Sequence, residues 1–291
     1  MRAPLRRRAG RRLWAYLELT KPRLTALLLL VAAASFLLAR PGAPDWRALL
    51  ALAGWLWLLA AGLFALNHFL ERGLDARMPR TRNRPLPAGR LRPAEALLFG
   101  LSLAPLALAG ITFRFGWVAG ALAGFTLVSY LFVYTPLKRR TPYHAVLGAG
   151  SGATPPLLGW AAATGGLSPA AGLLAAVLFF WQFAHFLAIG ALYAAEYEAA
   201  GVRVLPAERA RLARRLLVGS QALLVLASCG TVPAGLSRPA DLAGAAVLGG
   251  LYLVIGVRTV RRAGPREYRR LAAASVLYLP ALFILLLALR A

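Results

Sequence analysis

Residues 48–70 read ALLALAGWLWLLAAGLFALNHFL, and this stretch decides the class of fold. It is apolar from Ala48 to Leu66, and a helix that spans a bilayer needs roughly 20 mostly apolar residues. Runs of the same kind lie on both sides of it, at 24–39, 96–113, 116–136, 145–165, 169–193, 216–235, 240–257 and 271–289. The sequence therefore predicts an all-α, polytopic membrane protein with about nine transmembrane helices.

The composition excludes an ordinary soluble protein. Hydrophobic residues make up 59% of the 291 residues and charged residues only 15%, whereas soluble domains carry about 25% charged residues. No internal repeat or low-complexity linker divides the chain, so we expect one membrane-embedded domain over 1–291 that begins with a basic tail at 1–15. Because Cys229 is the one cysteine, an internal disulfide and a cysteine-based metal site are excluded.

The basic residues are unevenly distributed between the two sides of the predicted topology. With nine spans, alternate connections lie on opposite sides, and 29 of the 34 lysines and arginines fall on the side of the N-terminus. Basic loops are retained in the cytoplasm, so the pattern predicts a cytoplasmic N-terminus and an external C-terminus in the cell (inner or plasma) membrane. This topology explains the net charge of +24 without nucleic acid and makes the lipid bilayer the expected partner.

The helix predicted at 48–70 becomes polar at its end. Asn67, Glu71 and Asp75 follow one another at intervals of four residues, which places them on one face of a helix. Polar side chains at a membrane boundary are costly unless they bind a ligand, and oxygen donors suit Mg²⁺ and its phosphate ligands. Arg80 and Arg84 follow, and the guanidinium fork matches phosphate geometry. The alternative is a helix end that enters water with a basic anchor.

A second basic segment, residues 134–141, reads YTPLKRRT and contains Lys138 and Arg139. Lys138 is one of only two lysines in a chain that otherwise uses arginine. A compact ammonium suits a terminal phosphate, although a basic cluster of this kind is also typical of a cytoplasmic loop that only fixes the orientation of its helices. The glycines and prolines that follow favour close helix packing or a broken helix within 145–165.

A third segment, residues 181–186, reads WQFAHF and places Gln182 and His185 inside an apolar helix beside Trp181. Intramembrane polar residues indicate function more often than packing, although an isolated histidine is usually a packing residue. Here His185 could bind a haem iron or orient a haem propionate, and the sequence leaves that choice open. Glu196 and Tyr197 follow in the next polar segment.

These segments together resemble the intramembrane (UbiA-type) prenyltransferases. Asn-x₃-Glu-x₃-Asp at 67–75 resembles the first acidic motif of that superfamily, and Arg-Thr-x-x-Arg-Pro-Leu at 80–86 is most similar to the protohaem IX farnesyltransferase (haem O synthase) branch. The segments at 134–141 and 181–186 are similar to the same branch. The resemblance covers roughly residues 16–206, and the last three predicted helices match only as apolar spans.

The resemblance implies an enzyme that transfers a farnesyl group from farnesyl diphosphate to a vinyl group of haem b, with helices around a central cavity. It implies Mg²⁺ as cofactor and, as assembly partners, haem A synthase or a terminal oxidase. The residues to which it assigns roles are the catalytic Asn67, Glu71, Asp75 and Lys138, the metal ligands Asn67, Glu71, Asp75 and Glu196, the diphosphate ligands Arg80, Arg84, Lys138 and Arg139, and the haem-side residues Trp181, Gln182, His185 and Tyr197.

Several positions depart from the pattern of that branch. Gly73 and Ala195 stand where the branch often has acidic residues, so the number of metal ions is left open.

Three alternatives therefore remain: a UbiA-type enzyme that prenylates an aromatic quinone precursor, a catalytically silent haem-handling membrane protein, and a secondary transporter of an anionic substrate. A transporter predicts an internal repeat of broken helices, and the sequence shows no such repeat.

Overall fold

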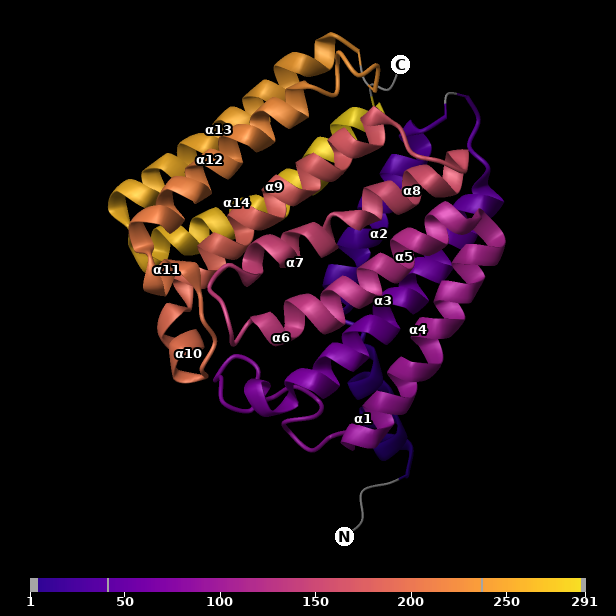
Figure 1. Ribbon diagram of the computed structural model, residues 1–291, viewed down its shortest axis with the longest axis vertical. Coiled ribbons are helices and arrows are strands. Elements are labelled where there is room, and N and C mark those ends of the chain that lie inside the picture. The colour runs from indigo at the N-terminus through magenta and orange to yellow at the C-terminus, as the bar shows by residue number, and fades with distance from the viewer. Residues whose placement is uncertain (1–4, 41, 237, 289–291) are drawn as a thin grey trace.

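The computed structural model describes residues 5–40, 42–236 and 238–288, and every regular element in these ranges is a helix, which confirms the all-α prediction. The long helices pack side by side in one bundle (Figure 1). In chain order they are α1 (Leu5–Leu19), α2 (Pro22–Leu38), α3 (Trp46–Asp75), α4 (Pro93–Phe115), α5 (Trp117–Val128), η1 (Ser129–Tyr134), α6 (Thr135–Leu137), α7 (His144–Gly152), α8 (Thr154–Thr164), α9 (Pro169–Leu192), α10 (Ala194–Ala199), α11 (Leu205–Glu208), α12 (Ala210–Cys229), α13 (Ala240–Arg262) and α14 (Pro265–Ala288).

The protein is a multi-pass membrane protein, but the number of spans differs from nine. Within the described ranges, seven helical segments are long and apolar enough to cross a membrane, and the bent pair of α1 and α2 would make eight. The predicted span 145–165 is instead two short helices, because Pro155 and Pro156 lack the backbone N–H groups needed to continue α7. The predicted span 24–39 is α2, which has 17 residues.

Helix α3 begins where Asp45 caps it, since the Asp45 carboxylate accepts a hydrogen bond from the Ala48 N–H at 2.9 Å. It runs for 30 residues and ends only at Asp75, past the predicted end at residue 70. The extension keeps Glu71 and Asp75 on the same helix as Asn67. The spacing of four residues therefore places all three on one face, as the sequence predicts.

Helix α5 does not reach the loop that contains Lys138 as a regular α-helix. Its last residue, Val128, is followed by the π-helix η1 and then by the single turn α6. A π-helix inserts an extra residue into the helical ladder, and such insertions are frequent at functional sites. The wider turn ends at Tyr134, directly before Thr135 and Lys138.

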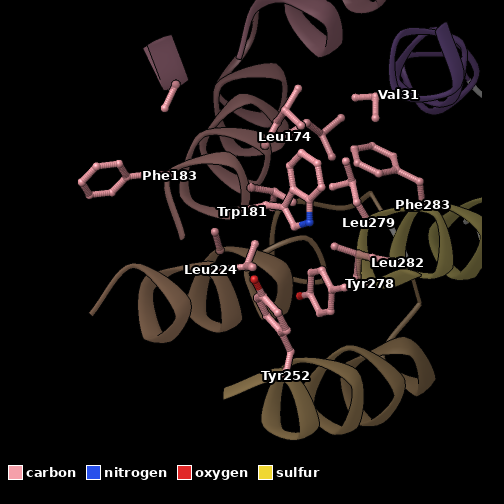
Figure 2. Close-up of a cluster of buried hydrophobic side chains, with 14 of the residues drawn as sticks. Val31, Leu174, Trp181, Phe183, Leu224, Tyr252, Tyr278, Leu279, Leu282 and Phe283 are labelled. Atoms are coloured by element: carbon pink, nitrogen blue, oxygen red, sulfur yellow. The ribbon is translucent and has the colours of Figure 1, made fainter. Parts of the chain in front are cut away.

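Two apolar cores hold the bundle. One joins α2, α3, α4, α5 and α8, and the other joins α9, α12, α13 and α14 with parts of α2 and α7. Figure 2 shows the second core, in which Trp181 lies among Leu174, Leu279 and Phe283. The rings of Tyr252 and Tyr278 stack there with centroids 5.1 Å apart.

The predicted basic tail belongs to α1 from Leu5 onward. Ala15 and Leu19 on this helix are buried against Ala65 and Leu91, while Trp14 is 68% exposed. In Figure 1, α1 lies at the lower end of the bundle and α14 ends near the upper end. The two ends of the described chain therefore lie at opposite ends of the bundle.

Candidate active site

The polar face of α3, defined as Asn67, Glu71 and Asp75, is buried. The exposed fractions of the three residues are 1%, 8% and 1%. Burial of two carboxylates is costly unless cations or hydrogen-bond donors compensate for it. Neighbouring groups must therefore compensate for the buried charges of Glu71 and Asp75.

Three cationic side chains from three different segments provide it, and we name them the cation cluster. Lys21 lies between α1 and α2, Arg84 lies in the loop after α3, and Lys138 follows α6. The contacts are Lys21 Nζ to Asn67 Oδ1 at 3.0 Å, Lys138 Nζ to Glu71 Oε1 at 2.5 Å, and Arg84 Nη1 to the two carboxylate oxygens of Asp75 at 2.8 and 2.9 Å. Burial and the neighbouring Arg84 lower the pKa of Lys21 to about 7. Protonated Lys21 therefore gives the cluster one positive charge more than the two carboxylates, which suits an anionic ligand, because a bound anion favours the protonated form.

Lys21 is the residue of this cluster that the sequence analysis did not include. Its backbone has φ of +47°, in the left-handed region, directly before Pro22. This conformation makes the bend of 48° between α1 and α2 and aims the ammonium at α3, 4.7 Å from the centroid of the Phe64 ring. The signal that could have identified it is its residue type, because the chain has only one other lysine.

The π-helix places a second set of groups around the polar face of α3. The Thr135 hydroxyl donates to the Tyr130 carbonyl oxygen at 2.8 Å and accepts from the Asn67 amide nitrogen at 3.3 Å. Lys138 Nζ lies 4.6 Å from the centroid of the Tyr134 ring. Burial opposes the charged form of Lys138, but the Tyr134 hydroxyl and the Glu71 carboxylate together raise its pKa above the ordinary value. Lys138 is therefore charged at neutral pH.

The predicted diphosphate ligands do not form one group. Arg84 and Lys138 contact the polar face of α3, whereas Arg80 and Arg139 are exposed. The Arg80 guanidinium donates to the Tyr197 hydroxyl at 3.1 Å and lies over the rings of Tyr193 and Tyr197. Arg139 lines a separate groove of about 670 Å³, which reaches Glu71 from its other side.

The third acidic residue of the predicted metal site lies apart from the first two. Among the described residues, no three His, Cys, Asp or Glu side chains are close enough to share a metal ion. Glu196 on α10 is half-buried, and its Oε2 atom is buried without a hydrogen-bond partner among the described residues. The resemblance assigns the acidic residues of this loop to a second metal ion, and the role of Glu196 as a metal ligand stays a prediction.

Trp181, Gln182 and His185 lie together, as the sequence suggests. They line a mainly apolar cavity of about 560 Å³, which we name the inner cavity, and this size is typical of a ligand site. Gly152 forms part of its wall, and a Cβ at this position would collide with the Gln182 amide. Tyr197, which was predicted on the same side, lies instead with Arg80 and is not part of this lining.

Aromatic side chains connect the inner cavity to the cation cluster. Tyr134 and Phe64 line the cavity and carry Lys138 and Lys21, respectively, over their rings. Tyr134 also stacks on Phe186 with centroids 6.5 Å apart. An elongated apolar ligand with an anionic head group could therefore place its head at the cation cluster and its tail in the inner cavity.

Comparison with known proteins agrees with this arrangement. The UbiA prenyltransferase family matches residues 27–287. A protein of Sorangium cellulosum (strain So ce56) named protoheme IX farnesyltransferase is 44% identical over 250 residues, which cover 85% of this chain and 89% of that protein. Other curated relatives that carry the same name are 36% to 41% identical.

The fold also matches solved structures. A structure of a digeranylgeranylglyceryl phosphate synthase has a TM-score of 0.80 at 15% identity and covers 95% of this chain and 98% of its own. A UbiA homolog from Archaeoglobus fulgidus bound to GPP and Mg²⁺ has a TM-score of 0.70 at 17% identity, with coverage of 94% and 99%. At this identity the likeness establishes a shared fold.

Proposed function

Because this chain belongs to the UbiA prenyltransferase family, we propose that it transfers a farnesyl group from farnesyl diphosphate to a vinyl group of haem b, giving haem O. The relatives named protoheme IX farnesyltransferase support the choice of substrates. The observation that carries the proposal is the cation cluster on the polar face of α3, which opens through Tyr134 and Phe64 into an apolar cavity. This arrangement suits a prenyl diphosphate.

The proposed farnesyl transfer breaks one carbon–oxygen bond and forms two new bonds, one to carbon and one to oxygen. The bond between farnesyl C1 and the diphosphate oxygen breaks, and its electron pair leaves with the diphosphate. The terminal carbon of a haem vinyl group forms the new bond to C1, and the other vinyl carbon becomes cationic. A water molecule adds there and releases a proton, which completes a hydroxyethylfarnesyl substituent.

The residues of this chain act mainly on the charges that develop. Lys21, Arg84 and Lys138 stabilise the negative charge that grows on the departing diphosphate, and they do so in a buried site where such contacts are strong. The aromatic faces of Tyr130 and Tyr134 line the cavity beside them and stabilise an allylic cation. The apolar lining also keeps bulk water away from that cation.

The polar face of α3 fits Mg²⁺, because Asn67, Glu71 and Asp75 offer side-chain oxygen atoms, the donors that this ion prefers. These three residues would hold the metal, and Glu196 is a further proposed ligand. A bound Mg²⁺ acts as a Lewis acid toward the diphosphate. The phosphate oxygens would take over the ammonium and guanidinium groups that the carboxylates now hold. The solved homolog with GPP and Mg²⁺ supports this assignment.

The acceptor is tested directly by a product assay. Purified protein incubated with haem b, farnesyl diphosphate and Mg²⁺ should form a haem whose mass has increased by one farnesyl group and one hydroxyl group, and chelation of Mg²⁺ should stop its formation. The control replaces haem b by an aromatic quinone precursor. Prenylation of that control alone would show the alternative UbiA-type activity, and no product from either acceptor would support the haem-handling alternative.

The orientation is a second proposal, with the N-terminus in the cytoplasm and the C-terminus outside the cell membrane. It requires the consecutive short helices α7 and α8 to cross the membrane together, in addition to the seven long helices and the α1–α2 pair. Residues 71–95 and 137–144 carry many of the basic residues, which favours the cytoplasm for both loops. Reporter fusions at Gly89 and Thr141 should therefore read inside, and fusions at Gly42 and Gly165 should read outside. A cytoplasmic signal at Gly165 would contradict this topology. Haem A synthase or a terminal oxidase remains the proposed assembly partner.

A further inference from the structure

His185 makes one hydrogen bond, and that bond identifies which ring nitrogen carries the proton. Its Nδ1 atom lies 2.6 Å from the Ser275 hydroxyl oxygen on α14. The same hydroxyl oxygen lies 2.6 Å from the Ala272 carbonyl oxygen. Each of these short contacts requires a hydrogen atom between its two heavy atoms.

Ser275 can supply only one of the two hydrogens. A carbonyl oxygen has no hydrogen, so the Ser275 hydroxyl must donate to Ala272. The hydroxyl oxygen therefore accepts from His185, whose Nδ1 carries a proton. A doubly protonated ring would be a buried charge without a carboxylate partner, which is costly. His185 is thus the neutral Nδ1–H tautomer, with a lone pair on Nε2.

The ring is held firmly and borders the inner cavity. Trp181 stacks on it with centroids 5.6 Å apart and an angle of 12° between the planes. The Trp181 indole N–H donates to the Ser275 carbonyl oxygen at 2.7 Å, so the same serine fixes both rings. Nε2 of His185 has no hydrogen-bond partner in the described part of the chain, and the residue lines the inner cavity.

We propose that Nε2 of His185 is an axial ligand of the iron of the acceptor haem, in a tautomer that Ser275 fixes. The inference rests on the proposed function, because it requires a haem in the inner cavity. Histidines that bind metals commonly donate their other ring N–H to a neighbouring acceptor in this way. Iron coordination would hold the macrocycle at one position, so that a vinyl group can face the farnesyl carbon.

The same geometry disfavours two other roles for His185. A propionate needs a hydrogen-bond donor, and Nε2 carries no proton in this tautomer. A general base would become a buried imidazolium, and that charge is costly because no carboxylate pairs with His185 among the described residues. A lone pair that can be shared without proton transfer suits a metal ion.

The test compares two porphyrins. Purified wild type and His185→Ala are titrated with haem b and with metal-free protoporphyrin IX, and absorbance and electron paramagnetic resonance spectra of the haem complexes are recorded. We expect a histidine-ligated haem spectrum in wild type and its loss in His185→Ala, with haem affinity lowered about 10- to 100-fold. Affinity for metal-free protoporphyrin should stay within about two-fold. Added imidazole should restore the ligated spectrum of His185→Ala.

Ser275→Ala tests the fixed tautomer and should also lower haem affinity about 10- to 100-fold without affecting metal-free protoporphyrin. The matched control is Ser228→Ala, which removes an equally buried hydroxyl that contacts Tyr278 on the same helix α14, at 2.9 Å. This control should leave both affinities and the spectrum unchanged.

An unchanged haem spectrum in His185→Ala, or equal loss of both porphyrins, would overturn the proposal. A wild type with a histidine-ligated spectrum that forms no farnesylated haem would overturn the proposed function and leave the ligand assignment intact. Formation of farnesylated haem by a wild type without a histidine-ligated spectrum would overturn the ligand assignment and leave the proposed function intact. A wild type that binds no haem would overturn both.

Discussion

Replacing Asp75 by Asn should lower the turnover number by roughly 10²- to 10³-fold, which is the usual effect of removing one strong stabilising group from an active site. Asp75 is 1% exposed, and both of its carboxylate oxygens accept from Arg84. The amide keeps the shape of the side chain but removes the charge that would hold Mg²⁺ and orient Arg84. The measurement is the rate of farnesylated haem formation, followed by mass.

A matched control lies at the other end of the same helix. Asp45 caps α3 and accepts from the Ala48 N–H, and Asn is an equally good cap. Asp45→Asn should therefore leave the rate within about two-fold. The affinity of Asp75→Asn for Mg²⁺, measured by the dependence of rate on metal concentration, should fall as well. Wild-type turnover in Asp75→Asn would contradict the role assigned to the polar face of α3.

Replacing Lys138 by Met should weaken binding of farnesyl diphosphate and lower kcat/KM by about 100-fold or more. Lys138 is the cation that contacts Glu71, and its raised pKa keeps it charged at neutral pH. The measurement is calorimetric titration with a non-hydrolysable farnesyl diphosphate analogue. Haem affinity should not change, because Lys138 does not line the inner cavity.

Lys138→Met also leaves Glu71 as a buried carboxylate without its cation, which costs about 3–5 kcal/mol. A lower melting temperature in detergent is therefore expected, and it could by itself explain a loss of activity. Comparison of the double variant Lys138→Met with Glu71→Gln against Glu71→Gln alone separates the two effects, because both lack the Glu71 carboxylate and only the double variant lacks Lys138. The double variant should recover most of the melting temperature, because the uncompensated charge is gone, but it should bind the diphosphate analogue more weakly than Glu71→Gln alone. Equal binding by these two variants would contradict a direct role for Lys138.

Local patterns in the sequence were sufficient for the helices and for the polar face of α3. A run of apolar residues forms a helix wherever it meets a bilayer, because its backbone groups must be satisfied within the segment. Side chains four residues apart share a face of that helix whatever surrounds it. Asn67, Glu71 and Asp75 are therefore found together, although α3 is longer than predicted.

Features that depend on helix breaks or on contacts between distant segments were harder to predict from the sequence. The apolar run at 145–165 has the length of a span, but the prolines divide it into α7 and α8. Lys21 carried the same signal as Lys138, a rare lysine in an arginine-rich chain, yet only the bend before Pro22 brings it to Asn67. Tyr197 was predicted on the haem side, and the structure shows it in contact with Arg80 and outside the lining of the inner cavity.

By itself, the sequence determined that this protein is a helical membrane protein, that one helix carries two carboxylates and an amide on one face, and that Trp181 and His185 lie one turn apart. These features depend on neighbours within a few residues along the chain. The tertiary structure decided which cation meets which carboxylate, and it placed Ser275 against a histidine 90 positions earlier in the chain. Such pairs depend on how α9 packs against α14 and how the bend before α2 packs against α3. Contacts between segments so far apart in the chain produce no periodic pattern of residues in the sequence.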